Sequence, residues 1–205
     1  MPADIATTPN GQAAMMYTGA IPWHRLGTRL DAPATAAEAI QAAGLDYTVE
    51  LQSLKTEADL RVPRRKVVVR TDTRAVLGVV SKGYTPIQNR QCFNFLDSLV
   101  ADNGLRYHTA GALGKGERIW LLAKLPSHIR VSGSDDEVQK FLLLSNSHDG
   151  SSALRCFFTG IRVVCANTLN AALREGAGEG ITIRHRGNLA DKVREARDAL
   201  GLAQR

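Results

Sequence analysis

The alternation of hydrophobic and polar positions along the chain predicts a sheet built from β-hairpins. Lys66–Arg70 and Val76–Val80 are β-branched runs separated by a short polar segment, an order typical of a hairpin. Tyr107–Leu113 and Ile119–Ala123 repeat this order around the turn Gly114–Gly116, so we expect a second hairpin there. Both hairpins imply antiparallel pairing of neighbouring strands.

The second half of the chain contains apolar runs that predict buried strands. Phe141–Leu144, Ala153–Phe158 and Ile161–Val164 have few polar residues, and we expect them at the centre of the sheet. Asp149-Gly150 predicts the tight turn that follows the first run. Ile181–His185 predicts a further short strand.

Four segments have the spacing or the boundary residues of helices. Thr35–Ala43 and Cys165–Arg174 predict two short helices, each followed by glycine within a few residues, as helix ends often are. Asn89 can cap a third helix, and Asn188 can cap a last one in which apolar residues recur at helical spacing.

Hairpins interspersed with helices predict an α+β fold, in which an antiparallel β-sheet carries helices on one face and leaves the other face free. We expect a flexible N-terminal arm at 1–20, an α+β core domain at 21–187 and an amphipathic C-terminal helix at 188–205. The chain stops within or just after that helix, so we expect a C-terminal truncation. The helix could pack on its own domain or on a partner.

Composition and charge narrow the range of partners. The 205 residues carry a formal net charge of +6, and 44% of them are hydrophobic, which suits a globular core and favours a polyanionic partner. The three cysteines form no C-x-x-C pair, and neither a signal peptide nor an apolar run of membrane-spanning length is visible. We therefore expect a soluble cytoplasmic protein with no membrane partner.

Basic residues gather in the segment from Arg61 to Lys82, where seven cations face the single acid Asp72. Strand alternation would place Lys66 and Arg70 on one solvated face, which could hold a phosphate backbone or simply be an ordinary charged edge. Tyr84 and Trp120 could stack on bases, although Trp120 in an apolar strand is also typical of a core residue. The candidate nucleic-acid-binding residues are Arg64, Arg65, Lys66, Arg70, Arg74, Lys82, Lys115, Arg118, Arg155 and Arg162.

Arg155 and Arg162 differ from the other candidates because each lies within an apolar run. A buried guanidinium has to be paired, so each of them is expected to have a definite partner. That partner could be structural, with Asp149 as a candidate, or it could be the phosphate of a ligand.

His148, Cys156 and Cys165 raise the possibility of nucleophilic catalysis, in which a histidine activates a thiol. Both cysteines lie among apolar residues, where a thiol is usually inert. The chain has no phosphate-binding loop of the G-x-x-x-x-G-K-[ST] type and no closely spaced zinc ligands. We therefore expect no enzyme activity, no metal and no nucleotide cofactor.

Five short motifs together resemble a known family. They are Pro22–Thr28, Ala43–Tyr47, Gly78–Val80 with Tyr84–Asn89, Ser145–Ser151 and Arg162–Leu169. In this order they closely resemble the phage/plasmid-like proteins that contain domain of unknown function 932, from about residue 20 to the end. Members of that family often carry glycine at the position of Arg25, and they tend to be longer.

The resemblance implies a phage or plasmid setting but no settled function. The chain also resembles, more distantly, the single-strand annealing recombination proteins of the Redβ and Erf type. This second resemblance is one of phage or plasmid setting, basic hairpins and order of strands and helices. That implies ATP-independent binding and annealing of single-stranded DNA by a homo-oligomeric ring or filament. Two alternatives stay open: an accessory protein of a mobile element that binds another protein through its final helix, and an enzyme that uses His148 and Cys156.

Overall fold

The computed structural model describes residues 3–99, 105–124 and 141–200, and in this part of the chain the apolar runs form one seven-stranded sheet. The strand order is β10-β9-β8-β7-β6-β1-β2, and every pairing is antiparallel except that of β1 with β2. The bounds are β1 Met15–Thr18, β2 Thr28–Leu30, β6 Arg106–Leu113, β7 Arg118–Lys124, β8 Phe141–Ser147, β9 Leu154–Thr159 and β10 Ile181–Ile183.

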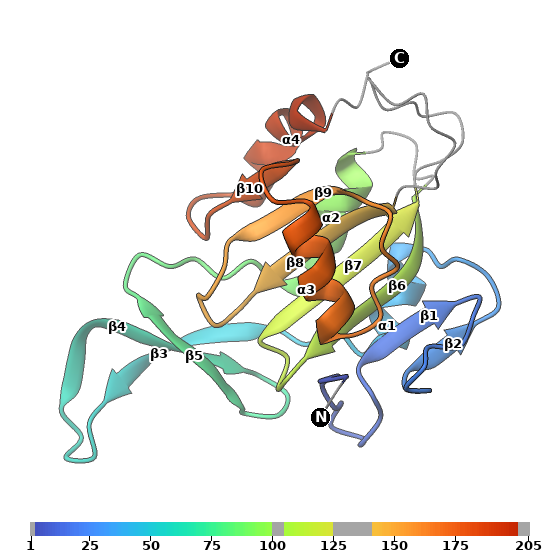
Figure 1. Ribbon diagram of the computed structural model, residues 1–205. Coiled ribbons are helices and arrows are strands. Elements are labelled where there is room, and N and C mark those ends of the chain that lie inside the picture. The colour runs from blue at the N-terminus through green and yellow to red at the C-terminus, as the bar shows by residue number, and fades with distance from the viewer. Residues whose placement is uncertain (1–2, 100–104, 125–140, 201–205) are drawn as a thin grey trace.

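Helices cover both faces of this sheet (Figure 1). Alternate strand residues such as Leu121 and Leu144 pack with α1 (Ala36–Ala42), α2 (Asn89–Leu99) and α4 (Val193–Ala199) in one core. Trp120 and Leu143 point the other way and pack beneath α3 (Ala166–Glu175). The predicted α+β fold with an antiparallel sheet is confirmed, but neither face is left free, because both sets of alternating side chains are apolar.

A second, three-stranded sheet extends to one side of the core, in the order β3-β4-β5 (Figure 1). It consists of β3 (Val49–Lys55), β4 (Arg61–Arg70) and β5 (Val76–Ser81), all antiparallel, and we call it the small sheet. The first predicted hairpin is therefore confirmed, as is the second, formed by β6 and β7. The basic segment lies in this small sheet and its edge, apart from the seven-stranded sheet.

The predicted N-terminal arm is wrong for its last residues. Met15 to Thr18 form the buried strand β1, which pairs with both β2 and β6. The Ala- and Thr-rich composition of residues 1–20 suggested a loose segment, but Met15, Met16 and Tyr17 supply apolar side chains to both faces of the sheet.

The apolar run Ile161–Val164 was predicted as a strand, and it forms none. Val163 and Val164 are buried in the core beneath α3, so the run is apolar because it packs there. The carbonyl of Val163 accepts a hydrogen bond from the Thr109 hydroxyl at 2.6 Å instead of a ladder bond from a neighbouring strand.

The predicted C-terminal helix begins as expected and packs on its own domain. Asn188 accepts a hydrogen bond from the amide of Ala190 and caps a 3₁₀ turn, Leu189–Lys192, that leads into α4. Leu189, Ala196 and Leu200 belong to the core shared with α2. Residues 201–205 of the predicted helix lie outside the described part. The other asparagine, Asn89, does not cap α2, because its buried side-chain oxygen faces Nε2 of His148 at 2.8 Å rather than a backbone amide of the helix.

Candidate nucleic-acid interface

The basic residues of β4 lie where that strand bulges. Ser53 pairs with Lys66 and Lys55 with Arg61, so four residues of β4 lie opposite Leu54 alone. Arg64 has a φ of 58°, in the left-handed region that a non-glycine residue rarely adopts, and its carbonyl accepts from the amide of Lys82. The bulge thus presents Arg64 and Arg65 to solvent, next to Lys82 at the end of β5.

Five cations of this region have no ion pair with any carboxylate in the described part of the chain. Four of them are exposed and Lys66 is partly buried. Asp59, in the β3–β4 turn, already pairs with Lys55 at 2.7 Å. We call these five the basic edge: Arg61, Arg64, Arg65, Lys66 and Lys82.

Three further candidates are partly engaged elsewhere. Arg74 is exposed but donates to Glu50 at 3.0 Å. Arg118 reaches the side chain of Asn170 at 3.4 Å. Lys115 is exposed at the tip of the β6–β7 hairpin, beside the β4–β5 turn rather than beside the basic edge.

Arg70 is a structural residue, which corrects its predicted place on a solvated face. Its side chain is 1% exposed and bonds both oxygens of Asp72 at 2.7 and 2.8 Å. It also donates to the carbonyl of Lys115 at 3.0 Å and lies 3.8 Å from the ring centroid of Tyr47. Lys66 and Arg70 do share a face by alternation, but so does buried Val68, and that face turns toward the core at its Arg70 end.

Arg155 and Arg162 are also structural, and their partners are backbone carbonyls rather than Asp149. Arg155 donates to the carbonyls of Leu173 and Gly176 at the end of α3. Arg162 donates to Thr18 and Ala20, at 2.7 and 2.8 Å, and so fixes the segment after β1. Carbonyls at a helix end carry partial negative charge, and cations are stabilised there.

Of the two aromatic candidates, Trp120 is fully buried and donates to Thr109, as expected for a core residue. Tyr84 stacks on His185, with ring centroids 4.6 Å apart, and its hydroxyl donates to the carbonyl of Ser147. The interface therefore offers charge rather than a row of free aromatic rings.

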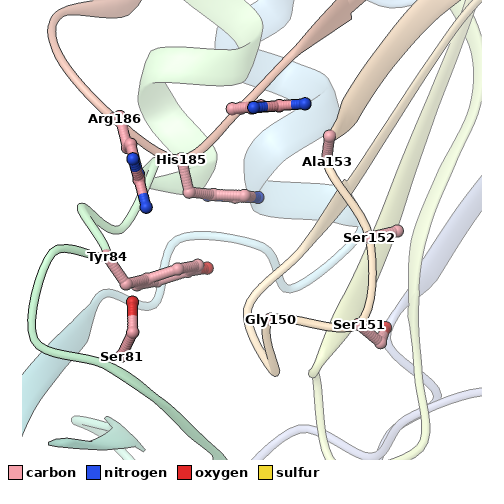
Figure 2. Close-up of a pocket in the computed structure, with 9 residues that line it drawn as sticks. Ser81, Tyr84, Gly150, Ser151, Ser152, Ala153, His185 and Arg186 are labelled. Atoms are coloured by element: carbon pink, nitrogen blue, oxygen red, sulfur yellow. The ribbon is translucent and has the colours of Figure 1, made fainter. Parts of the chain in front are cut away.

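A hollow of about 310 Å³ lies between the end of β5, the β8–β9 turn and the segment after β10. Figure 2 shows the stacked rings of Tyr84 and His185 on one side and the turn Gly150–Ala153 on the other. Arg184 and Arg186 are exposed and line the hollow. We call it the arginine hollow; its lining is Ser81, Tyr84, Gly150, Ser151, Ser152, Ala153, Arg184, His185 and Arg186.

A buried polar network joins the small sheet to the core beneath this hollow. His148 is fully buried and bonds the side-chain oxygen of Asn89 at 2.8 Å. Burial, together with smaller effects of His185 and Arg70, lowers the pKa of His148 to about 3, while the negative charge of Asp149 opposes this. The Tyr47 hydroxyl donates to the carbonyl of Gly116 in the same network.

The arrangement gives no support to the thiol chemistry considered above. Burial raises the pKa of Cys156, so its reactive thiolate form is disfavoured. His148 directs Nε2 to Asn89, and no hydrogen bond joins it to a cysteine among the described residues. All three cysteines are free and buried. Within the described residues, no cluster of three His, Cys, Asp or Glu side chains is placed to hold a metal ion.

A family model described as Domain of unknown function (DUF932) matches residues 76–205, which is more than half of the chain. The chain belongs to the DUF932 family. Curated proteins and solved structures gave no match. In the described part of the chain, no helix is long and apolar enough to cross a membrane.

The DUF932 match includes the arginine hollow but only β5 of the small sheet. It also includes the hydrogen-bonded contact between Tyr84–Asn89 and Ser145–Ser151, which we call the joint. Strand β4, which carries four of the five basic-edge cations, precedes the matched residues. In this joint Asn146 donates to the carbonyl of Ile87. The motif residue Gln88 also bonds both backbone groups of Val49, at the start of β3, which precedes the matched residues.

Sequence reasoning missed Arg184 and Arg186. The signal was present in the alternation from residue 181 to 186, where Ile181, Ile183 and His185 are buried and the intervening side chains are exposed. That period of two predicts two arginines on one solvent-facing side.

Proposed function

We propose that this DUF932 protein binds single-stranded nucleic acid through the basic edge and acts, without ATP, in strand annealing within a phage or plasmid. The observation that supports this most is the set of five cations without ion pairs along one bulged strand and its neighbour. When such cations neutralise the phosphates of a nucleic acid, the counterions condensed on those phosphates are released, and this release drives binding.

The basic edge suits the binding of a flexible single strand better than the sequence-specific reading of a duplex. None of the five basic-edge cations lies on a helix of the described chain, so the basic edge offers no recognition helix for the major groove of a duplex. Charge without free aromatic rings predicts binding with little sequence preference and a strong dependence on salt.

We also propose a homo-oligomer. Strands β2 and β10 are the edges of the seven-stranded sheet, and β3 and β5 are the edges of the small sheet. Pairing of such edges between copies would remove unpaired backbone groups and would align successive basic edges into one track. The protein-docking alternative loses its motivation, because the apolar side of α4 is buried against α2.

The test is a salt titration with a fluorescent single-stranded oligonucleotide. With roughly five phosphates contacted, the slope of log K against log salt should be about −3.5, and Arg64→Gln with Arg65→Gln should make it shallower by about 1.4. Arg29→Gln with Arg194→Gln removes the same charge from β2 and α4 and is the matched control.

The control pair should bind nearly as the wild type does. A flat salt response of the wild type, or equal losses in the two double variants, would refute the proposed interface.

A further inference from the structure

The arginine hollow has the chemistry of an anion site. Arg184 and Arg186 line it and have no ion pair in the described part of the chain. Guanidinium groups form paired hydrogen bonds with phosphate oxygens. Ser81, Ser151 and Ser152 add hydroxyl donors from two other segments of the chain.

Asp149, a carboxylate that acts electrostatically on His185, is already engaged. It accepts from the hydroxyl of Ser147 and from the amide of Ser151, and these bonds lower its pKa against the opposing effect of burial. Asp149 does not line the hollow. Its charge therefore offsets the two arginines only in part, and the hollow favours an anion.

His185 is a second observation that points to a ligand. Its side chain is 7% exposed, and neither ring nitrogen has a hydrogen-bond partner of good geometry among the described residues. Burial lowers the pKa of His185, while the nearby backbone of Thr85 and Ser152 partly opposes this. A buried imidazole at the wall of a polar hollow is satisfied when a ligand or water supplies a partner.

The size and the position of the hollow define the ligand further. A volume of about 310 Å³ lies at the lower end of small-molecule sites and suits one nucleotide unit better than a large cofactor. Ser81 lines the hollow and Lys82 follows it directly on the basic edge. A strand lying along the basic edge would thus reach the hollow with its end.

We propose that the arginine hollow binds a nucleotide phosphate monoester, the terminal phosphate of a strand held by the basic edge. A monoester carries more charge than the diester inside a strand and has three free oxygens for donors. The strand-end role rests on the proposed function, whereas the phosphate site itself does not.

The experiment compares one oligonucleotide with a 5′-phosphate, a 3′-phosphate or hydroxyls at both ends, and titrates inorganic phosphate separately. Wild-type protein should prefer one phosphorylated end by about tenfold, the effect of one charge-assisted hydrogen-bonding site. Arg184→Gln with Arg186→Gln should remove the preference, while the Arg29→Gln, Arg194→Gln control should keep it. Both changed arginines are exposed, so the fold should persist.

Titration with inorganic phosphate, followed by NMR of the histidine rings, provides a readout independent of DNA. The signals of His185 should shift in the wild type and stay still in the Arg184, Arg186 variant. If oligonucleotides bind but no end preference and no His185 shift appear, the phosphate site is refuted and the proposed function stands. If phosphate shifts His185 but no oligonucleotide binds, the site holds a free phosphate ester and the proposed function fails.

Discussion

Lowering the pH should destabilise this protein through one histidine. His148 is fully buried and its Nε2 faces the side-chain oxygen of Asn89, whose amide nitrogen donates to the carbonyl of Leu45. The oxygen of Asn89 is thus an acceptor, so Nε2 carries the ring proton and Nδ1 has none. No partner for Nδ1 is found among the described residues, and a second proton there would be a buried, unpaired charge.

The magnitude follows from the two pKa values. The folded pKa of His148 is about 3, whereas an exposed histidine has a pKa near 6.5. Below pH 6.5 the unfolded chain therefore binds a proton at His148 that the folded chain does not bind. The contribution of His148 to the free energy of unfolding is fully present above that pH and is lost as the pH falls toward 3. At pH 5 the loss from His148 alone should be about 2 kcal/mol.

The assay is urea unfolding at pH 7 and pH 5 for wild type and His148→Gln. Glutamine can still donate to Asn89 but does not titrate, so the variant should lose about 2 kcal/mol less than the wild type between these pH values. His108→Gln is the comparison, because His108 is half-buried and its pKa is lowered to about 4, chiefly by burial. Because both folded pKa values lie below pH 5, the two variants should flatten the profile similarly between pH 7 and pH 5, and only below about pH 4 should the effect of His148→Gln exceed that of His108→Gln. Parallel pH profiles for wild type and His148→Gln would refute this reasoning.

Two other predictions test the proposed chemistry and assembly. Cys156→Ala and Cys165→Ala should each leave oligonucleotide binding unchanged and cost about 1 kcal/mol of unfolding free energy, because both thiols are buried packing groups; loss of a catalytic turnover in folded Cys156→Ala protein would contradict this. Light scattering at micromolar protein should give a mass above the 22.2 kDa of one chain, rising with a long oligonucleotide; a mass of one chain in both conditions would exclude the homo-oligomer.

Strand and helix positions could be predicted mainly where one apolar period governed the segment. The hairpins and α2 follow from their hydrophobic patterns, and the buried strand β8 follows from its continuous apolar run. The strand predicted at Val163 and Val164 was wrong, because a segment that packs beneath a helix is as apolar as a central strand. Met15 to Thr18 were missed because four residues are too few for a periodic signal.

The candidate site was predictable as a charge cluster but not residue by residue. Sequence gives the cations of the Arg61–Lys82 segment, but it does not show that Arg70 finds Asp72 and the carbonyl of Lys115, 45 positions away. Arg155 and Arg162 were correctly expected to have definite partners. The sequence could not identify those partners, because any residue can supply a free backbone carbonyl at a helix end or a turn. Such partners depend on tertiary packing.

The position of the small sheet links the two proposed sites. Gly78 in β5 approaches the backbone of Asp149 so closely that a Cβ would lie 2.7 Å from it. A Cβ on Gly150 would lie 2.9 Å from the side chain of Val80. Motif residues on both sides of this contact, Tyr84 and Asn89 on one and Ser147 and His148 on the other, are hydrogen-bonded across it. The motifs that identify the family therefore act here as a joint. By holding β5 against the β8–β9 turn they fix the distance between the basic edge and the arginine hollow. Under the two proposals, a strand bound at the basic edge would therefore reach the hollow in a constant register.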